Sequence, residues 1–510
     1  MKTKSLLLVF FTTSLLGFSQ PTIEWEKSLG GSNHDSAYSM QQTSDGGYII
    51  VGSSMSNDGD VTDNQGGSDY WVVKLSITGS LQWQKSLGGD LFEWAHSTKQ
   101  TTDGGYVILG ESYSNNGDVS GNNGESDYWI VKLSSTGVLQ WEKTLGGSGI
   151  DSGQSIQQTS DGGYIVAGFS ASNDGDVTNN HGSEDYWVVK LSTTGDIQWE
   201  KTLGGSSYDL ATSIQQTSEG GYIVAGMSSS NNGDVSGNHG NLDYWIVKLN
   251  STGNIVWQKS LGGTEADKAR SIQQTSDGGF IVAGQSRSND GDVTGNHGYE
   301  DYWVVKLSSI GVIEWERSLG GSNQEIAYSI VQTLGGDFSV VGYSESNDGD
   351  VTGNHGDSDI WIAKLSSTGS LLWQKSLGGS ELEFGEAIIQ TTGYSFVVAG
   401  TSRSNDGDVT GNHGASDFWI VKLSPDLGVS DNEFINTTVL YPNPSSGSVN
   451  IETEDIKTVT LFDSVGKKSY FKELTGESSV NINVSHLAKG VYMVVILTSK
   501  QRLVKKLIIK

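Results

Sequence analysis

The chain has 510 residues, no cysteine and a formal net charge of −28. Without cysteine no disulfide can hold the fold, and so acidic a surface repels nucleic acid phosphates and anionic membranes. The negative charge is concentrated in residues 20–426, which hold 51 acidic and 19 basic residues, whereas 10 basic and 8 acidic residues follow from Leu427 onward.

The first residues have the features of an export signal. Two lysines precede an apolar stretch over residues 6–16, and small residues suit cleavage just before Gln20. We therefore expect residues 1–19 to be a signal peptide. No apolar stretch is long enough to span a bilayer comfortably, so we predict no transmembrane segment. The lack of cysteine also excludes a lipid-anchored lipoprotein.

A repeat of 58 residues fills most of the chain. The segment SNDGDVTGNHG occurs unchanged at 288–298, 346–356 and 404–414, and four close variants precede it at the same spacing. Each repeat holds four short apolar runs separated by Gly, Asn, Asp and Ser, which we name strands A (such as SIQQT), B (YIVAG), C (YWVVKL) and D (DIQWEKTL). Such units in series predict an all-β fold, a seven-bladed β-propeller with one unit per blade.

The ends of the repeat region predict how the ring closes. A lone D strand at 22–31 begins this region, and a lone C strand at 417–423 ends it. Pairing of these two strands would complete the seventh blade and remove an exposed edge. We therefore expect a closed propeller over residues 20–424, with residues 22–28 paired to 417–423.

Two tryptophans recur in each repeat and predict the core between blades. Burying one such ring removes about 150–250 Å² from water, which at about 25 cal/mol/Å² is worth several kcal/mol. Such rings can replace disulfides, and we expect them to be core rather than a platform for sugar rings. One set lies on strand C and the other on strand D: Trp71, Trp129, Trp187, Trp245, Trp303, Trp361 and Trp419, and Trp25, Trp83, Trp141, Trp199, Trp257, Trp315 and Trp373.

The hairpin between strands C and D resembles that of propellers of the pyrroloquinoline-quinone type. In KLSITGSLQWQKSL, residues 74–87, a Leu, a Thr-Gly turn and a Trp recur as they do in that family. The resemblance implies the propeller architecture alone. It does not extend to the quinone cofactor, because the cysteine pair of the quinone enzymes is missing and the loops differ.

One face of the propeller is expected to carry acidic loops. If strand A lines the central channel, the D–A and B–C loops leave the same face and only short turns leave the other. In the second repeat the D–A loop also carries Trp94, the one tryptophan outside the two repeated positions, and His96. We predict that this face binds a ligand, with Trp94 stacking on a sugar ring or other apolar surface; the alternative is that Trp94 is a hydrophobic plug. The predicted ligand-binding residues are Trp94, His96 and the D–A acids Asp35, Glu93, Asp151, Asp209, Asp267, Glu325 and Glu383.

The B–C loop resembles a calcium loop of the EF-hand or dockerin type. Counting from Asp290, oxygen-bearing side chains stand at positions one, three, five and twelve, and a glycine stands at position six. Calcium is the one cofactor that this pattern suggests, bound with weak affinity of about 10⁻⁴–10⁻³ M. The alternative is that these side chains hold Asx-turns and anchor strand C. The calcium hypothesis names Asp58, Asp60, Asp69, Asp174, Asp176, Asp185, Asp290, Asp292, Thr294, Asp301, Asp348, Asp350, Asp359, Asp406, Asp408 and Asp417.

The segment after the propeller changes in composition. Residues 425–436 are expected to be a linker, and alternating apolar runs over 437–510 predict a small β-sandwich. This segment resembles the C-terminal sorting domain of the type IX secretion system. The resemblance implies recognition by that machinery, removal of the domain, and a product that is secreted or attached to the outer surface of a Gram-negative bacterium. The matching residues are Tyr441-Pro442-Asn443-Pro444, Gly447, Leu461-Phe462-Asp463, Gly466, Leu487, Gly490-Val491-Tyr492 and Lys505-Lys506-Leu507.

Two classes of function remain open. The first is a non-catalytic secreted or cell-surface propeller that binds a glycan or a protein on its acidic face. The second is a secreted polysaccharide-degrading enzyme, a hydrolase or a lyase. Catalysis needs unlike groups with distinct pKa values, whereas here every loop acid recurs in each repeat. The sequence therefore favours binding and predicts no catalytic residue.

Overall fold

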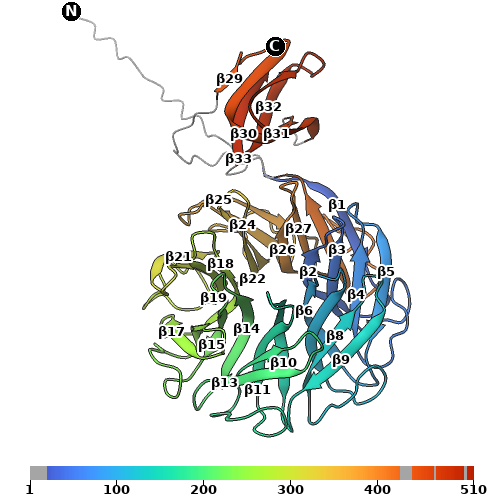
Figure 1. Cartoon of the computed structure of the whole chain (residues 1–510), viewed down its shortest axis with the longest axis vertical. Helices are drawn as coiled ribbons and strands as arrows, with labels where there is room; N and C mark the ends of the chain where they lie inside the picture. The colour runs from blue at the N-terminus through green and yellow to red at the C-terminus, as the bar shows by residue number, and fades with distance from the viewer. Residues whose placement is uncertain (1–19, 426–438, 464–466, 499–501) are drawn as a thin grey trace, which may run out of the picture.

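The computed structural model describes residues 20–425, 439–463, 467–498 and 502–510, and every regular element in these ranges is a β-strand (Figure 1). The expected signal peptide and most of the expected linker lie outside the described residues. Within the described ranges, no helix is long and apolar enough to cross a bilayer.

The repeat region forms seven four-stranded antiparallel sheets, which confirms the predicted seven-bladed propeller. In each blade the strands pair in the order A–B–C–D. The A strands surround the centre of the ring and the D strands lie at its rim (Figure 1).

The strand bounds repeat with the 58-residue period. The A strands are β2 (Asp35–Gln42), β6 (Glu93–Gln100), β10 (Asp151–Gln158), β14 (Asp209–Gln216), β18 (Asp267–Gln274), β22 (Glu325–Gln332) and β26 (Glu383–Gln390). The B strands are β3 (Tyr48–Ser54), β7 (Tyr106–Ser112), β11 (Tyr164–Ser170), β15 (Tyr222–Ser228), β19 (Phe280–Ser286), β23 (Phe338–Ser344) and β27 (Phe396–Ser402). The C strands are β4 (Asp69–Leu75), β8 (Asp127–Leu133), β12 (Asp185–Leu191), β16 (Asp243–Leu249), β20 (Asp301–Leu307), β24 (Asp359–Leu365) and β28 (Asp417–Leu423). The D strands are β1 (Ile23–Leu29), β5 (Leu81–Leu87), β9 (Leu139–Leu145), β13 (Ile197–Leu203), β17 (Ile255–Leu261), β21 (Ile313–Leu319) and β25 (Leu371–Leu377).

The seventh blade is assembled from both ends of the repeat region. Strand β1 pairs antiparallel with β28, with Lys27 opposite Ile420, which confirms the predicted closure. Across the same pair the Trp419 indole Nε1 donates a hydrogen bond to Glu26 Oε2 at 3.1 Å. The last blade is therefore complete, and β2 contacts β26 as well as β6 to continue the ring.

The two sets of tryptophans are buried to different degrees. All seven C-strand tryptophans have no exposed surface, as predicted for core. Six of these tryptophans pack against a tyrosine or phenylalanine ring of the preceding blade. For example, the ring centroids of Tyr128 and Trp187 are 4.6 Å apart. The D-strand tryptophans are only partly buried, apart from Trp373, because strand D is the outer edge of each blade.

The recurring SIQQT sequence joins neighbouring blades at the centre of the ring. Ser39 Oγ accepts a hydrogen bond from the backbone N–H of Thr98, and Gln41 Oε1 accepts one from the N–H of Gln100. The side chain of Gln100 in turn accepts the N–H of Ser44 in the first blade. These polar side chains satisfy backbone groups at the inner edge of each sheet, where a strand would otherwise leave them unpaired.

The chain after the propeller forms one connected five-stranded sheet around its own core. Its strands are β29 (Val439–Tyr441), β30 (Ser448–Phe462), β31 (Lys468–Asn483), β32 (Gly490–Thr498) and β33 (Arg502–Ile509). The pairing of β30 is irregular between Glu452 and Ile456, and the core joins residues from both halves of β30, including Ile451 and Leu461. A single sheet that encloses a core in this way accounts for the sandwich-like pattern of the sequence.

The seventh blade meets this C-terminal sheet through an unusual turn. In the first six blades the A–B turn contains a glycine with positive φ, such as Gly46 at 82°. In the seventh blade Tyr394 adopts this conformation, with φ of 66°, which is costly for any residue with a Cβ. The Tyr394 ring is buried with Phe462 and Val495 of the C-terminal sheet, and this contact offsets the strain.

Candidate ligand-binding face

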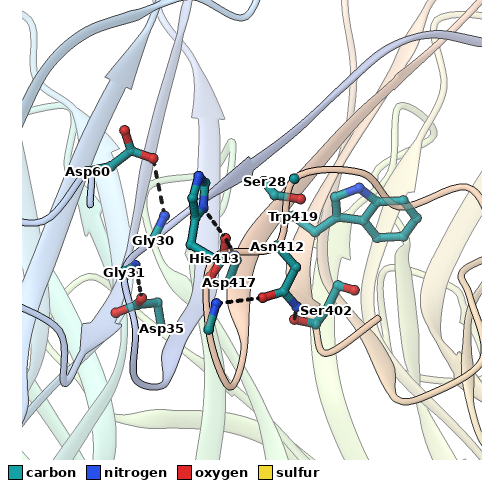
Figure 2. Close-up of polar contacts among 12 residues, drawn as sticks. Ser28, Gly30, Gly31, Asp35, Asp60, Ser402, Asn412, His413, Asp417 and Trp419 are labelled. Carbon is teal, nitrogen blue, oxygen red and sulfur yellow. Dashed lines mark hydrogen bonds and ion pairs between the residues drawn. The ribbon is translucent and has the colours of Figure 1, made fainter. Parts of the chain in front are cut away.

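The D–A and B–C loops meet on one face of the propeller, as the sequence predicts. The backbone N–H of Asp60, in a B–C loop, donates to the carbonyl of Gly30, in the preceding D–A loop. Figure 2 shows these loops in the first blade together with the B–C loop of the seventh. Each pair of neighbouring blades brings the same groups together.

The D–A acids hold these loops together from the inside. Asp35 Oδ2 accepts hydrogen bonds from the Gly31 N–H at 2.7 Å and the Ser56 hydroxyl at 2.9 Å, and Oδ1 accepts the Ser54 hydroxyl. The ligand-binding hypothesis has these acids at the surface of the face, but the structure gives none of them any exposed area. A ligand could reach them only if both loops opened. The acids concerned are Asp35, Glu93, Asp151, Asp209, Asp267, Glu325 and Glu383.

A second buried carboxylate lies beside each D–A acid. A Cβ built on Gly146 would fall 2.5 Å from Asp127 Oδ1 and 2.5 Å from Asp151 Oδ2, so the two oxygens lie within about 5 Å of each other. Only glycine fits between them, which explains the first glycine of the recurring LGG sequence. The same arrangement occurs at all seven blade boundaries, between the D–A acid and the first residue of the preceding blade's C strand: Asp69, Asp127, Asp185, Asp243, Asp301, Asp359 and Asp417.

These carboxylate pairs have perturbed protonation. Burial raises the pKa of Asp69 to about 7, with further contributions from the nearby charges of Glu93 and Asp118. Burial likewise raises the pKa of Asp127 to about 7, helped by Asp151. The Oδ1 atom of every C-strand acid is buried without a hydrogen-bond partner that donates to it. Protonation of the C-strand acid would remove the charge that burial and the neighbouring acid disfavour.

The oxygens named by the calcium hypothesis accept hydrogen bonds from the chain itself. Asp58 Oδ1 accepts the Ser32 N–H at 2.7 Å, and Asp60 Oδ2 accepts the Gly30 N–H at 3.4 Å. Asp69, the twelfth-position residue of that loop, lies at the next blade boundary beside Glu93. In the fifth repeat the Thr294 hydroxyl donates to Glu316. The structure thus divides each proposed ligand set between two blade boundaries.

The histidines of the B–C loops are also bound within the loops. In the five repeats that have one, the histidine Nδ1 lies 2.6–2.8 Å from Oδ2 of the C-strand acid four residues later, as in His413 and Asp417 (Figure 2). Over the ranges that the structure describes, no three acidic or histidine side chains are grouped closely enough to hold a metal ion. The hydrogen bonds favour the Asx-turn interpretation, and calcium binding stays a prediction.

Thermal unfolding with added calcium separates these two interpretations. A ligand that binds the folded state raises the Tm by mass action, so calcium bound at about millimolar affinity would shift it. Because the loop oxygens already accept backbone hydrogen bonds, we expect the same Tm in millimolar CaCl₂ and in EDTA, at matched ionic strength. A rise in calcium that EDTA reverses, and that Asp290→Asn abolishes, would instead support a metal site.

The repeats differ from one another chiefly at the channel mouth, which we define as the second and fourth residues of the A strands. Other positions of strand A vary less: the first residue is always acidic and the last is always Gln, while the seventh is Gln in four copies and Lys, Val or Ile in the others. The second residues are Ser36, Trp94, Ser152, Leu210, Lys268, Ile326 and Phe384, and the fourth are Tyr38, His96, Gln154, Thr212, Arg270, Tyr328 and Glu386. Sequence reasoning singled out Trp94 and His96 but missed the others, although comparison of the seven copies position by position would have found them.

A cavity of about 370 Å³ opens at this mouth between the seventh, first and second blades. Trp94 lines this cavity. It lies on strand β6 rather than in the D–A loop predicted from the sequence, and its ring is partly buried against Phe92 and Tyr113. His96 packs on Tyr38, with ring centroids 5.7 Å apart. The side chains that line the cavity include Tyr38, Trp94, Phe384, Glu386, His34 and Arg403.

Glu386 is the one carboxyl among the described residues that line this cavity. Burial raises its pKa to about 8, and the positive charge of Arg270 opposes that rise. At neutral pH the group is therefore mostly a neutral carboxylic acid, able to donate as well as accept a hydrogen bond.

The opposite face carries the short A–B and C–D turns. The A–B turn is TSDGG or a close variant in the first five copies, whereas the sixth and seventh have TLGGD and TTGYS, and a strand-C lysine pairs with an acid of this turn in most copies, as in Lys74 and Asp45 at 3.0 Å. The same pair recurs as Lys132 with Asp103 and Lys190 with Asp161. The lysine–acid pair is thus a repeated structural contact, unlike the varied second and fourth residues at the channel mouth.

Residues 439–510 match the family described as secretion system C-terminal sorting domain, which confirms the resemblance found in the sequence. The chain is thus a β-propeller followed by a sorting domain of the type IX secretion system. It is a protein that this system exports, and its location is secreted or at the cell surface.

The chain also has more distant similarities, each over part of its length. It is 24% identical over 422 residues to the regulatory protein FlaEY of Caulobacter vibrioides, a match that covers 73% of this chain and 43% of that protein, less than half of its length. Among solved structures it is similar to BamB from Moraxella catarrhalis, at 13% identity and a TM-score of 0.37, covering 79% of this chain and 100% of that one. It is also similar to the WD40 domain of Neurospora crassa Pan2, at 12% identity and a TM-score of 0.40, covering 78% and 95%. These scores are too low to bear on the fold, which rests on the strand pairing above.

Processing during export gives a prediction about the mature protein. Signal cleavage before Gln20 and removal of the sorting domain after about Asn436 should leave the propeller alone. Intact-mass measurement on protein from the culture medium or cell surface of the native host checks both ends. Exported protein that retains residues 439–510 would contradict removal of the domain.

Proposed function

We propose that this chain is a non-catalytic propeller that binds an extracellular ligand, a glycan or a protein, at its channel mouth. The observation that carries the proposal is the clustering of the non-repeated side chains. Seven nearly identical blades provide a rigid frame, and the residues that distinguish one copy from another gather at one end of the channel. A structural frame needs no such differences between copies, whereas binding of an asymmetric ligand requires different side chains around the site.

The composition of the mouth suits binding. Trp94, Tyr38 and Phe384 offer aromatic surface, and Glu386 and Arg403 offer polar contacts within the same cavity. A concave site with apolar walls and a few placed polar groups is the usual form of a small-ligand site. The partly exposed faces of such rings can stack on the apolar face of a sugar.

The alternative of a polysaccharide hydrolase is less well supported. Such enzymes generally use two carboxyl groups on opposite sides of the scissile bond, about 5–9.5 Å apart. Glu386 has a pKa of about 8, which suits a general acid, but no second carboxyl lines the cavity within the described residues. The geometry therefore favours binding.

Substitution of Trp94 tests the proposal directly. A glycan array and a panel of extracellular proteins from the native host would identify a ligand of the wild-type chain. Trp94→Ala should then weaken its binding at least tenfold, because the ring lines the cavity, while the Tm changes little, because the ring is only partly buried. A variant that binds normally but melts several degrees lower would show that Trp94 is a plug.

A further inference from the structure

The basic residues of the propeller are distributed in an informative way. Of the 19 that the acidic region contains, 14 occupy the two lysine positions that recur on strands C and D in each blade, one of them as Arg317. The five remaining cations all lie on strand A or just after strand B. They are Lys99, Lys268, Arg270, Arg287 and Arg403.

Three of these five belong to the fifth blade. Lys268 and Arg270 are the second and fourth residues of β18, and Arg287 directly follows β19. The guanidinium of Arg270 lies over the ring of Tyr328 at 5.7 Å, and that of Arg287 over the ring of Tyr299 at 4.4 Å. Aromatic faces thus hold both arginines in place beside the mouth.

The positive charge of this group is only partly balanced. Arg287 Nε donates to Glu300 Oε1 at 2.7 Å, and the other carboxylate oxygen of Glu300 accepts the Gln324 amide. Arg270 Nε donates to the neutral Gln285. Burial lowers the pKa of Lys268; Glu300 opposes this effect, and the charges of Arg270 and Arg287 add to it. Among the described residues, Arg287 is thus the member of this group with a direct carboxylate salt bridge, while Glu345, just after β23 (Phe338–Ser344) in the next blade, is exposed.

This group and the aromatic cavity share one channel. Glu386, which lines the cavity, interacts electrostatically with Arg270 and with Tyr328 across the fourth-residue ring. Burial raises the pKa of Glu386, so it carries less negative charge at pH 7 than an exposed carboxylate would. The cavity of Trp94 and Phe384 and the cations on β18 thus belong to the same channel mouth, around which the A strands stand.

We propose that Lys268, Arg270 and Arg287 form a subsite for an anionic group of the ligand, and that the ligand is an acidic glycan bearing carboxylate or sulfate groups. This inference rests on the proposed function. The aromatic cavity favours a sugar over an acidic peptide, because a stacked sugar ring presents its charged substituent at its edge. The arginine guanidiniums suit planar carboxylate or sulfate groups, which accept paired hydrogen bonds.

The test uses the full chain and short oligosaccharides that differ in charge alone. Oligogalacturonate and its methyl ester have the same length and ring geometry, and only the first is anionic. We expect tighter binding of the acid, weakened by added NaCl, and a loss of at least about tenfold in Lys268→Gln and Arg270→Gln. Lys259→Gln, which removes a recurring lysine from the outer strand β17, is the matched control and should bind normally.

Each other outcome has a defined meaning. Equal binding of acid and ester, insensitive to Lys268→Gln but lost in Trp94→Ala, would overturn the anionic subsite and leave the proposed function standing. Binding of a short poly-glutamate peptide, but not of the oligosaccharide, in a manner that depends on Lys268 would overturn the glycan assignment. If neither oligosaccharide nor its sulfated counterpart binds, the inference is wrong, and the proposed function is judged by the wider screen.

Discussion

At pH 8, Asp127→Asn should raise the free energy of unfolding by about 2 kcal/mol and the Tm by several degrees. In the wild type, Asp127 Oδ1 is buried without a hydrogen-bond donor and lies within about 5 Å of Asp151 Oδ2, so ionisation of Asp127 is unfavourable there. An asparagine carries no charge that burial would disfavour, and its carbonyl can still accept the Asn123 N–H that Asp127 Oδ2 accepts at 2.9 Å. The figure is the pKa shift of Asp127 converted to free energy and reduced for solvent screening.

The sign of the pH dependence follows from the raised pKa. In the folded chain the Asp127 pKa is about 7, against an ordinary value near 4, so the folded state holds the extra proton between these values. In this respect the wild type is therefore most stable below about pH 4, and its stability falls as the pH rises from about 4 to about 7. The advantage of Asp127→Asn should be small at pH 5 and full at pH 8.

A natural exchange within the repeats supplies the control. Asp58→Asn makes the same chemical change at an exposed loop position that is already Asn116 and Asn232 in two copies. It should leave the pH dependence of the free energy of unfolding unchanged between pH 4 and 9. Denaturant unfolding from pH 4 to 9 checks both variants, and a loss of stability in Asp127→Asn at pH 8 would contradict the account of the paired carboxyls.

Trp187→Ala should lower the free energy of unfolding by about 3–5 kcal/mol. The Trp187 ring has no exposed surface and lies 4.6 Å from the ring of Tyr128 in the preceding blade. Its Nε1 donates to Glu200 Oε2 at 3.2 Å, a partner that alanine would leave without its donor. The cost combines lost burial with the cavity left between two blades.

The comparison with Trp94→Ala makes this result specific. Both changes remove a tryptophan from the propeller, but only Trp187 occupies a recurring core position. Calorimetry of the two variants should show a large decrease in Tm for Trp187→Ala and little change for Trp94→Ala. Equal decreases would contradict the division into frame and binding residues.

The fold was predictable because the same pattern of four strands recurs along the sequence. Seven copies of each strand specify seven blades, and the lone strands at 22–31 and 417–423 specify closure by β1 and β28. Partial exposure of the D-strand tryptophans was missed, because the repeat pattern does not distinguish an edge strand from a central one. The contact of Tyr394 with Phe462 was also beyond reach, because it joins two domains with no shared pattern.

The candidate site was only partly predictable. Topology correctly predicted that the D–A and B–C loops lie on one face. The recurring loop acids were predicted to bind the ligand, whereas most of the varied residues at the channel mouth were not. Composition cannot distinguish a buried acid such as Asp35, which binds Gly31 and Ser56, from an exposed one. Nor can spacing along one loop show that Asp69 faces Glu93 of the next blade, because that contact depends on how blades pack.

The most direct test of the account reverts the channel mouth to the residue found in other copies. The triple variant Trp94→Ser, Lys268→Ser and Phe384→Ser gives each position the residue of Ser36 and Ser152. A matched control, Ile77→Ser with Ile310→Thr, makes the same kind of reversion at exposed turns of the opposite face. On a glycan and protein array the control should bind the wild-type ligands unchanged, and the mouth variant should lose them at least tenfold while remaining folded. Retention of those ligands by the folded mouth variant would contradict the claim that this propeller binds at its channel mouth.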